Sequence, residues 1–531
     1  MTNDPANIAA ALRTLALYAV CAVLAIIIGV LMTNPWTYTS LGFVGLVLAV
    51  LLVPVLLKWH QPLLIFCWFT PIMMFFIKGD PNLSLVIITI SLVISVTERA
   101  LGQTHFLNVP RISWPLFALI GVVLLTAKLT GGLGLRAFGS EVYGGKKYIF
   151  LVVGILGYFA LTARPIPLEK AQRYVSLFFL GGTLSCIQDF YQIMPGLLRP
   201  VYLLIPPLAI NPEGIQFGTT RLSGTGWAAT AFVSFLIARY GIRGIFLSGK
   251  LWRPAVFFIS IVLIFFGGFR SALLMTGLTI VLQFFLEGMH RTKLMPFFVA
   301  SVLAFMAVAI PLGSKLPFTF QRTLAILPES WIHLSPDARL AAQDSTDWRI
   351  QMWQGLLPQI PKYLLVGKGY AISMEDFAVM GQDSAFRSAD AGEQALALSG
   401  DYHNGPLSVI IPFGIWGAIA FVWFTVVSLH AMYRNFRYGD PALRIINTFL
   451  FTSYIVGTFG FYFIVGGLAS GMLQFAGLLG LSVAINRGVC RAPAAVPAKV
   501  IPFNRFKNIR RFVNSPPQPA LQNKALGDPS R

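Results

Sequence analysis

The sequence predicts an all-α polytopic membrane protein, and three observations lead to that prediction. Of the 531 residues, 56% are hydrophobic and only 11% are charged, whereas soluble proteins carry about 25% charged residues. The mean hydropathy is +0.72. Apolar runs of roughly 20 residues, the length that crosses about 30 Å of hydrocarbon as a helix, recur along most of the chain. These runs are continuous rather than alternating, which excludes a transmembrane β-barrel.

We expect about 12–14 transmembrane helices, the lower number if neither of the short runs 62–77 and 226–239 spans. Residues 200–210 are too short and too rich in proline to span, which favours a re-entrant or interfacial segment there. The apolar runs lie at 14–33, 38–57, 62–77, 83–97, 113–128, 147–163, 174–193, 226–239, 252–268, 271–286, 295–312, 405–430, 445–463 and 470–486.

The formal net charge of +20 indicates membrane topology rather than a nucleic-acid partner, because Lys and Arg accumulate on the cytoplasmic ends of membrane helices. Alternate loops, such as TNPWT and IVGGLAS, are nearly free of positive charge. Both termini are therefore expected in the cytoplasm. The other loops contain Arg13, Lys58, Arg99, Arg111, Arg164, Lys170, Arg173, Arg239, Arg243, Lys250, Arg253, Arg291, Lys293, Arg434, Arg437 and Arg444.

The chain divides into four predicted segments. Residues 1–313 form the N-terminal transmembrane bundle, 314–404 a large outward loop, 405–486 the C-terminal transmembrane helices, and 487–531 a basic, disordered cytoplasmic tail that meets anionic lipid. Loops beyond about 15 residues are usually functional or disordered. This one contains an amphipathic piece in which Ile350, Trp353, Leu356 and Leu357 recur at helical spacing, so we expect a partly helical cap.

Four scattered cysteines have neither redox nor metal-site spacing, so no disulfide framework or zinc site is expected. The N-terminal segment is poor in positive charge, which favours a retained membrane helix over a cleaved signal. The chain also lacks a Walker loop, a His-Glu-x-x-His motif and a Gly-x-Ser-x-Gly motif. Metal-dependent catalysis and nucleotide hydrolysis are therefore not expected, and no cofactor is predicted.

His403 is the first candidate for chemistry, in the stretch Asp401-Tyr402-His403-Asn404. Asn404 or Gly405 is the expected N-cap, with proline starting the apolar helix that follows. The positive end of that helix dipole disfavours protonation of the imidazole and keeps it neutral. A neutral histidine can act as a general base. Asp401 could orient it. A histidine that only caps the helix is the alternative.

Two arginines at the ends of apolar runs are the next candidates. Arg270 follows Gly267-Gly268, and paired glycines let backbone or substrate approach closely. An intramembrane charge indicates a functional site unless it snorkels to the headgroups. Arg221, in TTRLSGTG, precedes a helix whose N-terminal amides favour anions, and Arg binds phosphate in a bidentate fashion. In the loop, Arg349 and the turn at Gly367, Gly369 and Tyr370 are expected to shape the region beneath the cap.

The order and spacing of these motifs resemble those of the O-antigen ligase and O-antigen polymerase superfamily of bacterial envelope enzymes. The matching segments are RLSGTG at 221–226, GGFRSALL at 267–274, WRIQMWQGLLPQIPKYLLVGKGY at 348–370 and HNGPL at 403–407. The resemblance implies a type C glycosyltransferase fold in the bacterial inner membrane, with its active site facing the periplasm. Such enzymes move a glycan from a polyprenyl (undecaprenyl) diphosphate carrier to an acceptor hydroxyl without a metal.

The resemblance also implies roles for the candidate residues. Arg270 and Arg221 would hold the diphosphate, and His403 would position or deprotonate the acceptor. The substrate-binding residues would be Asp401, Tyr402, Asn404, Arg349, Gly367, Gly369 and Tyr370.

The acceptor stays open at this point. A lipid A core, a growing polysaccharide and a protein are all compatible, which corresponds to a ligase, a polymerase and a protein O-glycosyltransferase. A transporter or flippase for a lipid-linked sugar is the alternative from another class. Transporters tend to show inverted repeats and mid-membrane charges. No such repeat is evident, and the polar residues concentrate near one membrane face, which favours the transferase.

Overall fold

The computed structural model describes residues 5–32, 38–102, 106–132, 134, 144–208, 221–371, 400 and 402–492. These residues form helices and turns, with a single β-bridge between Met73 and Asn82. The all-α prediction is therefore confirmed for the described part of the chain. Asp401 and the tail from residue 493 onward lie outside it.

Eight described helices are long and apolar enough to cross a membrane, and four shorter apolar helices accompany them. Within the described residues, the eight candidate spans are fewer than the 12–14 expected, and the four shorter apolar helices are not long enough to be counted with them. The eight are α3 (Leu83–Ala100), α4 (Pro110–Leu129), α5 (Gly145–Thr162), α9 (Ser223–Phe246), α12 (Leu294–Leu312), α18 (Gly405–Tyr438), α19 (Arg444–Phe463) and α20 (Leu468–Ile485). The four lie within α1 (Pro5–Met32) and α2 (Tyr38–Cys67) and in α10 (Trp252–Phe266) and α11 (Arg270–Leu286).

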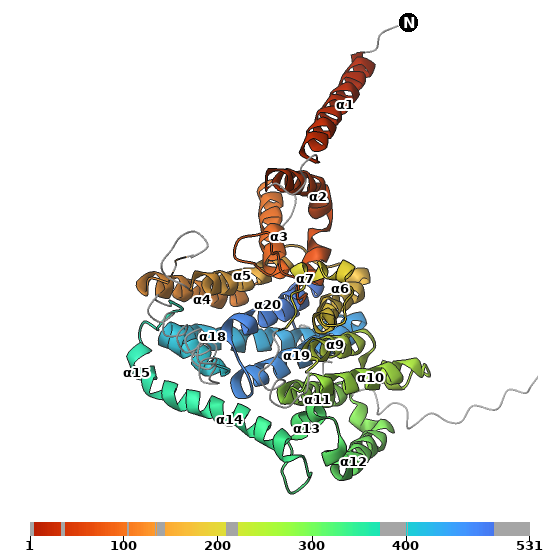
Figure 1. Cartoon of the computed structure of the whole chain (residues 1–531), viewed down its shortest axis with the longest axis vertical. Helices are drawn as coiled ribbons and strands as arrows, with labels where there is room; N and C mark the ends of the chain where they lie inside the picture. Colours follow the sequence, from red (N-terminus) through yellow and green to blue (C-terminus); the bar gives the residue numbers. More distant parts are fainter. Residues whose placement is uncertain are drawn as a thin grey trace, which may run out of the picture. The chain divides into compact units, whose positions relative to one another are not determined.

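The core forms where α20 packs on α5 and α19, α18 packs on α4 and α19, and α9 packs on α10 (Figure 1). Trp68 is 1% exposed in this core and donates from Nε1 to the carbonyl of Leu473 at 3.1 Å. Gly477 of α20 makes room for it, because a Cβ there would lie 2.3 Å from the indole nitrogen. By contrast, only 6% of the residues in the apolar stretch of α12 are buried, so this helix lies at the margin of the bundle.

Two apolar runs form shorter helices than their length predicted. The run 62–77 is not a span of its own, because α2 continues through it to Cys67 and turns follow. The run 174–193 begins as α6 (Leu168–Leu180) and continues as the 3₁₀ helix η2 (Gly181–Phe190). A Cβ on Gly181 would lie 2.1 Å from the carbonyl oxygen of Phe66, so the chain changes helix type where it passes α2. Within 200–210, α7 (Val201–Leu204) has four residues and is too short to span.

The run 405–430 is one helix, α18, with a break at Gly414. This glycine has φ 63° and ψ −163°, a conformation that side-chain-bearing residues rarely adopt. Pro412 removes an N–H from the same turn. The freed amide of Ile415 donates to the carbonyl of Leu364 at 2.7 Å. The first leg of α18 therefore turns sharply away from the second, and a loop segment fills the break.

The large loop is partly helical, as expected. It contains α13 (Phe318–Leu324), α14 (Pro336–Leu356), η6 (Leu357–Gln359) and α15 (Ile360–Tyr363). Ser335 caps α14, and its Oγ accepts from the amide of Ala338. One apolar cluster ties Leu324 and Ile332 to Phe265 of α10, and a second ties Leu356 to Tyr402 and α18. The long helix α14 thus bridges from α13 to α15 beside α18 (Figure 1).

Candidate active site

Arg221 and Arg270 are brought together by close backbone packing of the two glycine motifs. The amide of Leu222 donates to the carbonyl of Phe266 at 3.1 Å. A Cβ on Gly226 would lie 2.9 Å from the Cα of Gly267, so the start of α9 touches the end of α10. The sequence-based expectation that these glycines allow close backbone approach is confirmed.

Gly268, at φ +66°, turns the chain from α10 into α11 alongside the Arg221 side chain. A Cβ there would lie 3.4 Å from Arg221 Nε. The Arg221 guanidinium carbon is 5.9 Å from the centroid of the Phe269 ring. Arg270 is the first residue of α11. The two motifs therefore place two cations side by side at the same end of the bundle.

Arg349 of α14 is a third cation at this place. Burial lowers the pKa of the Arg349 guanidinium, and the positive charge of Arg270 lowers it further. Burial is also the main cause that lowers the pKa of Arg221, to about 10, with Arg270 the second. Arg349 Nε is buried without a hydrogen-bond partner. Three like charges that repel one another in a partly buried place form a site suited to an anion.

One turn of α14 connects the arginines to His403. Arg270 Nη2 donates to Thr346 Oγ1 at 3.1 Å. Two residues further along, the ring of Trp348 meets His403 edge-on, with 5.6 Å between ring centroids. Thr346, Trp348 and Arg349 lie within roughly 5 Å along the helix axis. The arginines and the histidine thus converge on a single turn of the cap helix.

His403 is held between two fixed neighbours. Asn404 is the N-cap of α18, as predicted, and its Oδ1 accepts from the amide of Leu407 at 3.1 Å. On the other side, the carbonyl of Tyr402 accepts from Trp353 Nε1 at 2.8 Å. His403 itself has φ 47°, a left-handed conformation that is uncommon outside glycine and costs energy. The surrounding contacts impose this backbone, which aims the imidazole toward α14.

The N-terminus of α9 has a different role from the one predicted. The carboxylate of Asp189, in η2, accepts from the amide of Gly224 at 3.0 Å and from that of Thr225 at 2.5 Å. The anion that these two amides bind is thus a carboxylate of the protein itself, and Asp189 anchors the start of α9. The guanidinium groups are the remaining groups here that could hold a substrate anion.

The turn at Gly367, Gly369 and Tyr370 lies at the break in α18, away from this convergence. The amide of Lys368 donates to Ile411 and that of Gly369 to Pro412, at 2.8 and 2.9 Å. The amide of Tyr370 donates to Tyr148 Oη at 2.7 Å. Pro412 is eight residues from Asn404, roughly 12 Å along a helix. These contacts hold the cap to α5 and α18.

Gly367→Ala tests this anchoring role. The residue has φ +83°, and a Cβ would lie 2.2 Å from the Pro412 carbonyl oxygen. We expect the substitution to lower the free energy of unfolding by about 3 kcal/mol, measured by denaturant titration of the purified protein. Gly355→Ala is the control, because a Cβ at this α14 position meets nothing within 4 Å and should stabilise by about 0.5–1 kcal/mol. Equal effects of the two substitutions would contradict the anchoring role.

The structure therefore divides the predicted site residues into groups. Arg221, Arg270, Arg349, His403 and Asn404 come together at α14. Tyr402 is 2% exposed and packs in an apolar cluster with Leu356 and Leu407, and burial raises the pKa of its hydroxyl. Its side chain is a core element. Sequence reasoning missed Thr346, Trp348 and Asp189, whose importance depends on contacts between distant segments.

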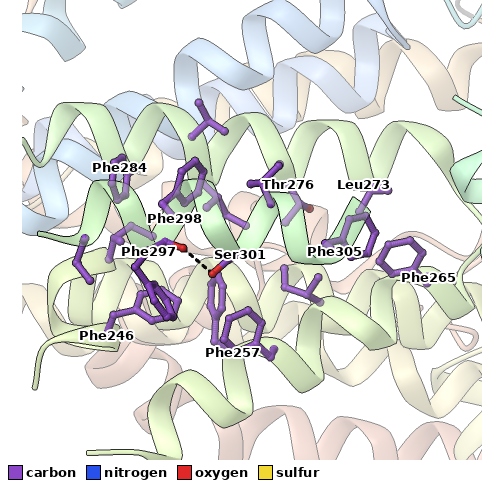
Figure 2. A pocket seen from close by; sticks show the side chains of 18 residues that line it. Phe246, Phe257, Phe265, Leu273, Thr276, Phe284, Phe297, Phe298, Ser301 and Phe305 are labelled. Carbon is purple, nitrogen blue, oxygen red and sulfur yellow. Dashed lines mark hydrogen bonds between the residues drawn. The ribbon is translucent and has the colours of Figure 1, made fainter. Parts of the chain in front are cut away.

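An apolar groove begins at Leu273, one helical turn from Arg270. It is a cavity of about 410 Å³ between α9, α10, α11 and α12, and Figure 2 shows its phenylalanine-rich lining. Leu273, Gly277, Ile280 and Phe284 of α11 line it, and they continue from Arg270 at helical spacing. From Leu273 to Phe284 the groove follows roughly 16 Å of helix. We call it the α11 groove. A cationic head on an apolar channel fits an amphipathic anion.

The helices and this site define a class of protein: a polytopic helical membrane protein in which three arginines and a histidine meet at one turn of a cap helix. Residues 255–422 match the family model described as O-antigen ligase. This part of the chain is therefore an O-antigen ligase family domain, which indicates a glycosyltransferase that uses lipid-linked glycans. The match includes Arg270, Arg349 and His403, and Arg221 precedes it. A search of curated proteins found no match.

Proposed function

We propose that this protein transfers a glycan from a polyprenyl (undecaprenyl) diphosphate carrier to an acceptor hydroxyl at the periplasmic face of the bacterial inner membrane, without a metal. The observation that carries the proposal is the convergence of three arginines and His403 on one turn of α14, at the head of the α11 groove. The diphosphate neutralises the arginines, and the polyprenyl chain follows the groove.

The proposed reaction assigns a role to each group. The acceptor oxygen attacks the anomeric carbon of the glycan while the bond from that carbon to the diphosphate oxygen breaks. His403 takes the proton of the acceptor hydroxyl as general base. The bonding electrons go to the diphosphate, whose growing charge Arg221, Arg270 and Arg349 stabilise. Cationic side chains thus provide the charge stabilisation that a metal supplies in other transferases.

The distribution of charged loop residues supports a periplasmic site. Arg99 lies in the last turn of α3, Arg164 follows α5, and Arg434 and Arg437 lie near the end of α18. His403 and the cap lie at the opposite end of α18. Lys and Arg in short loops mark the cytoplasmic side, so the cap faces the periplasm.

Gly277→Trp in the α11 groove tests the assignment of the carrier chain. Gly277 lines the groove and a Cβ there meets nothing within 4 Å, so an indole fills space that the chain would occupy. We expect the KM for undecaprenyl-diphosphate glycan to rise about tenfold. The kcat should change little, because the distant chain binds equally in ground and transition states.

Gly121→Trp is the matched control, because Gly121 is an exposed position on α4 with nothing within 4 Å of a Cβ. Its KM should equal that of the wild type. An unchanged KM for Gly277→Trp, measured with purified protein in nanodiscs, would place the carrier chain elsewhere.

A further inference from the structure

Trp348 lies between the arginines and His403. Its ring meets that of His403 edge-on, with 5.6 Å between the ring centroids. Arg349 follows it directly in α14. Because successive residues of a helix are turned by about 100°, Arg349 lies about 60° from Thr346 and about 100° from Trp348 around the axis. Thr346 accepts from Arg270, so the order around α14 is Arg270, Arg349, Trp348 and His403.

The indole of Trp348 keeps polar and apolar surface that no protein group uses. The residue is half-buried, and within the described part of the chain its Nε1 donates to no other residue. Trp68 in the core and Trp353, one turn further along α14, both donate from Nε1 to backbone carbonyls. These two tryptophans hold the fold together, whereas Trp348 retains a donor and part of its ring for a ligand.

The proposed reaction requires a sugar ring at this place. The diphosphate lies at the arginines and the acceptor hydroxyl lies at His403, so the ring that is bonded to the diphosphate must lie between them. Such a ring has C–H groups on its faces and hydroxyl groups around its edge. The negative face of an aromatic ring attracts C–H groups, and the indole N–H can donate to a hydroxyl. Trp348 therefore offers a complementary surface.

We propose that Trp348 stacks on the sugar ring bonded to the diphosphate and so determines which donor is bound. This inference rests on the proposed function and adds a specificity-determining residue to it. Stacking fixes the anomeric carbon between the arginines and His403, where the acceptor attacks. The released undecaprenyl diphosphate carries no sugar and gains nothing from Trp348. The tryptophan thus favours binding of the donor over binding of the spent carrier.

Equilibrium binding to the purified protein in nanodiscs, without acceptor, tests the proposal. The probes are undecaprenyl diphosphate and undecaprenyl diphosphate that carries one N-acetylglucosamine, a sugar whose equatorial substituents leave C–H groups on its faces. Trp348→Leu should weaken binding of the sugar-bearing probe about tenfold and leave binding of undecaprenyl diphosphate unchanged. Trp348→Phe keeps an aromatic ring and should lose less affinity. A displaced imidazole cannot mimic this result, because His403 faces the acceptor side.

Trp331→Leu is the matched control, because Trp331 is a tryptophan of the same loop that is 56% exposed and lies outside the site. It should bind both probes as the wild type does. Equal weakening of both probes by Trp348→Leu would assign Trp348 a structural role in the cap. Unchanged binding of both probes would exclude the donor sugar from Trp348, and a raised KM for the acceptor alone would place the acceptor there.

Each of these results overturns the proposal, as would equal affinity of the wild type for the two probes. Failure of the wild type to bind either probe would contradict the proposed function instead.

Discussion

His403→Ala is expected to lower the kcat of glycan transfer by about 10²–10⁴-fold, the usual contribution of a general base. Binding of the undecaprenyl-diphosphate glycan should change little, since His403 faces the acceptor side of the site. The measurement is single-turnover transfer in nanodiscs together with donor binding at equilibrium. Retention of near-normal kcat would show that His403 is a structural residue at the start of α18.

His403→Asn separates chemistry from backbone conformation. Asn tolerates the left-handed φ of 47° found at this position better than most residues. It keeps a polar side chain beside Trp348, but it cannot accept a proton at neutral pH. We expect the Asn variant to fold with the stability of the wild type and to be as inactive as the Ala variant. Activity restored by Asn would contradict the role of His403 as the base.

Arg270→Ala is expected to lower kcat by about 10²–10³-fold, as removal of one preorganised group that stabilises developing charge does elsewhere. The charge of Arg270 acts on both other arginines, and its Nη2 donates to Thr346 of α14, so Arg270 connects Arg221 to the cap helix. The folded state without substrate should not be destabilised, because the substitution relieves repulsion among like charges. The measurements are kcat and the thermal midpoint in the absence of donor.

Arg270→Lys and Arg239→Ala are the controls. Lys keeps the charge but loses the planar, bidentate group, so it should restore only part of the rate. Arg239 is an exposed residue near the far end of α9, and its removal should leave kcat unchanged. A large fall in the thermal midpoint of Arg270→Ala would assign Arg270 a structural role and contradict the charge argument.

Local signals predicted much of this molecule. Composition and apolar runs predict an all-α membrane protein, and Asn404 caps α18 as its side chain and the following Gly-Pro indicate. Gly267 forms the close backbone contact expected from paired glycines. The O-antigen ligase resemblance rests on short motifs in order, and the family match over residues 255–422 confirms it. These features depend on residues close together in the sequence, or on the order and spacing of short motifs, which the sequence shows directly.

Other features depend on contacts between distant segments. The carboxylate of Asp189 accepts hydrogen bonds from amides that lie 35 and 36 residues away. No local sequence pattern predicts this partner. The turn at Gly367 packs against the break in α18 at Gly414, so the role of each glycine depends on a segment far away in the sequence. Trp348 belongs to a motif recognised in the sequence, yet its contact with His403 appears only once α14 lies across the site. For the same reason, the break of α18 at Gly414 could not be predicted from the single apolar run 405–430.

The most direct test of the central claim follows both products of the wild-type reaction. Purified protein in nanodiscs, with undecaprenyl-diphosphate glycan as donor and an acceptor that carries a free hydroxyl, should release one undecaprenyl diphosphate for each glycosidic bond formed. In proteoliposomes, movement of intact lipid-linked glycan across the bilayer without release of undecaprenyl diphosphate would contradict a transferase and establish a transporter.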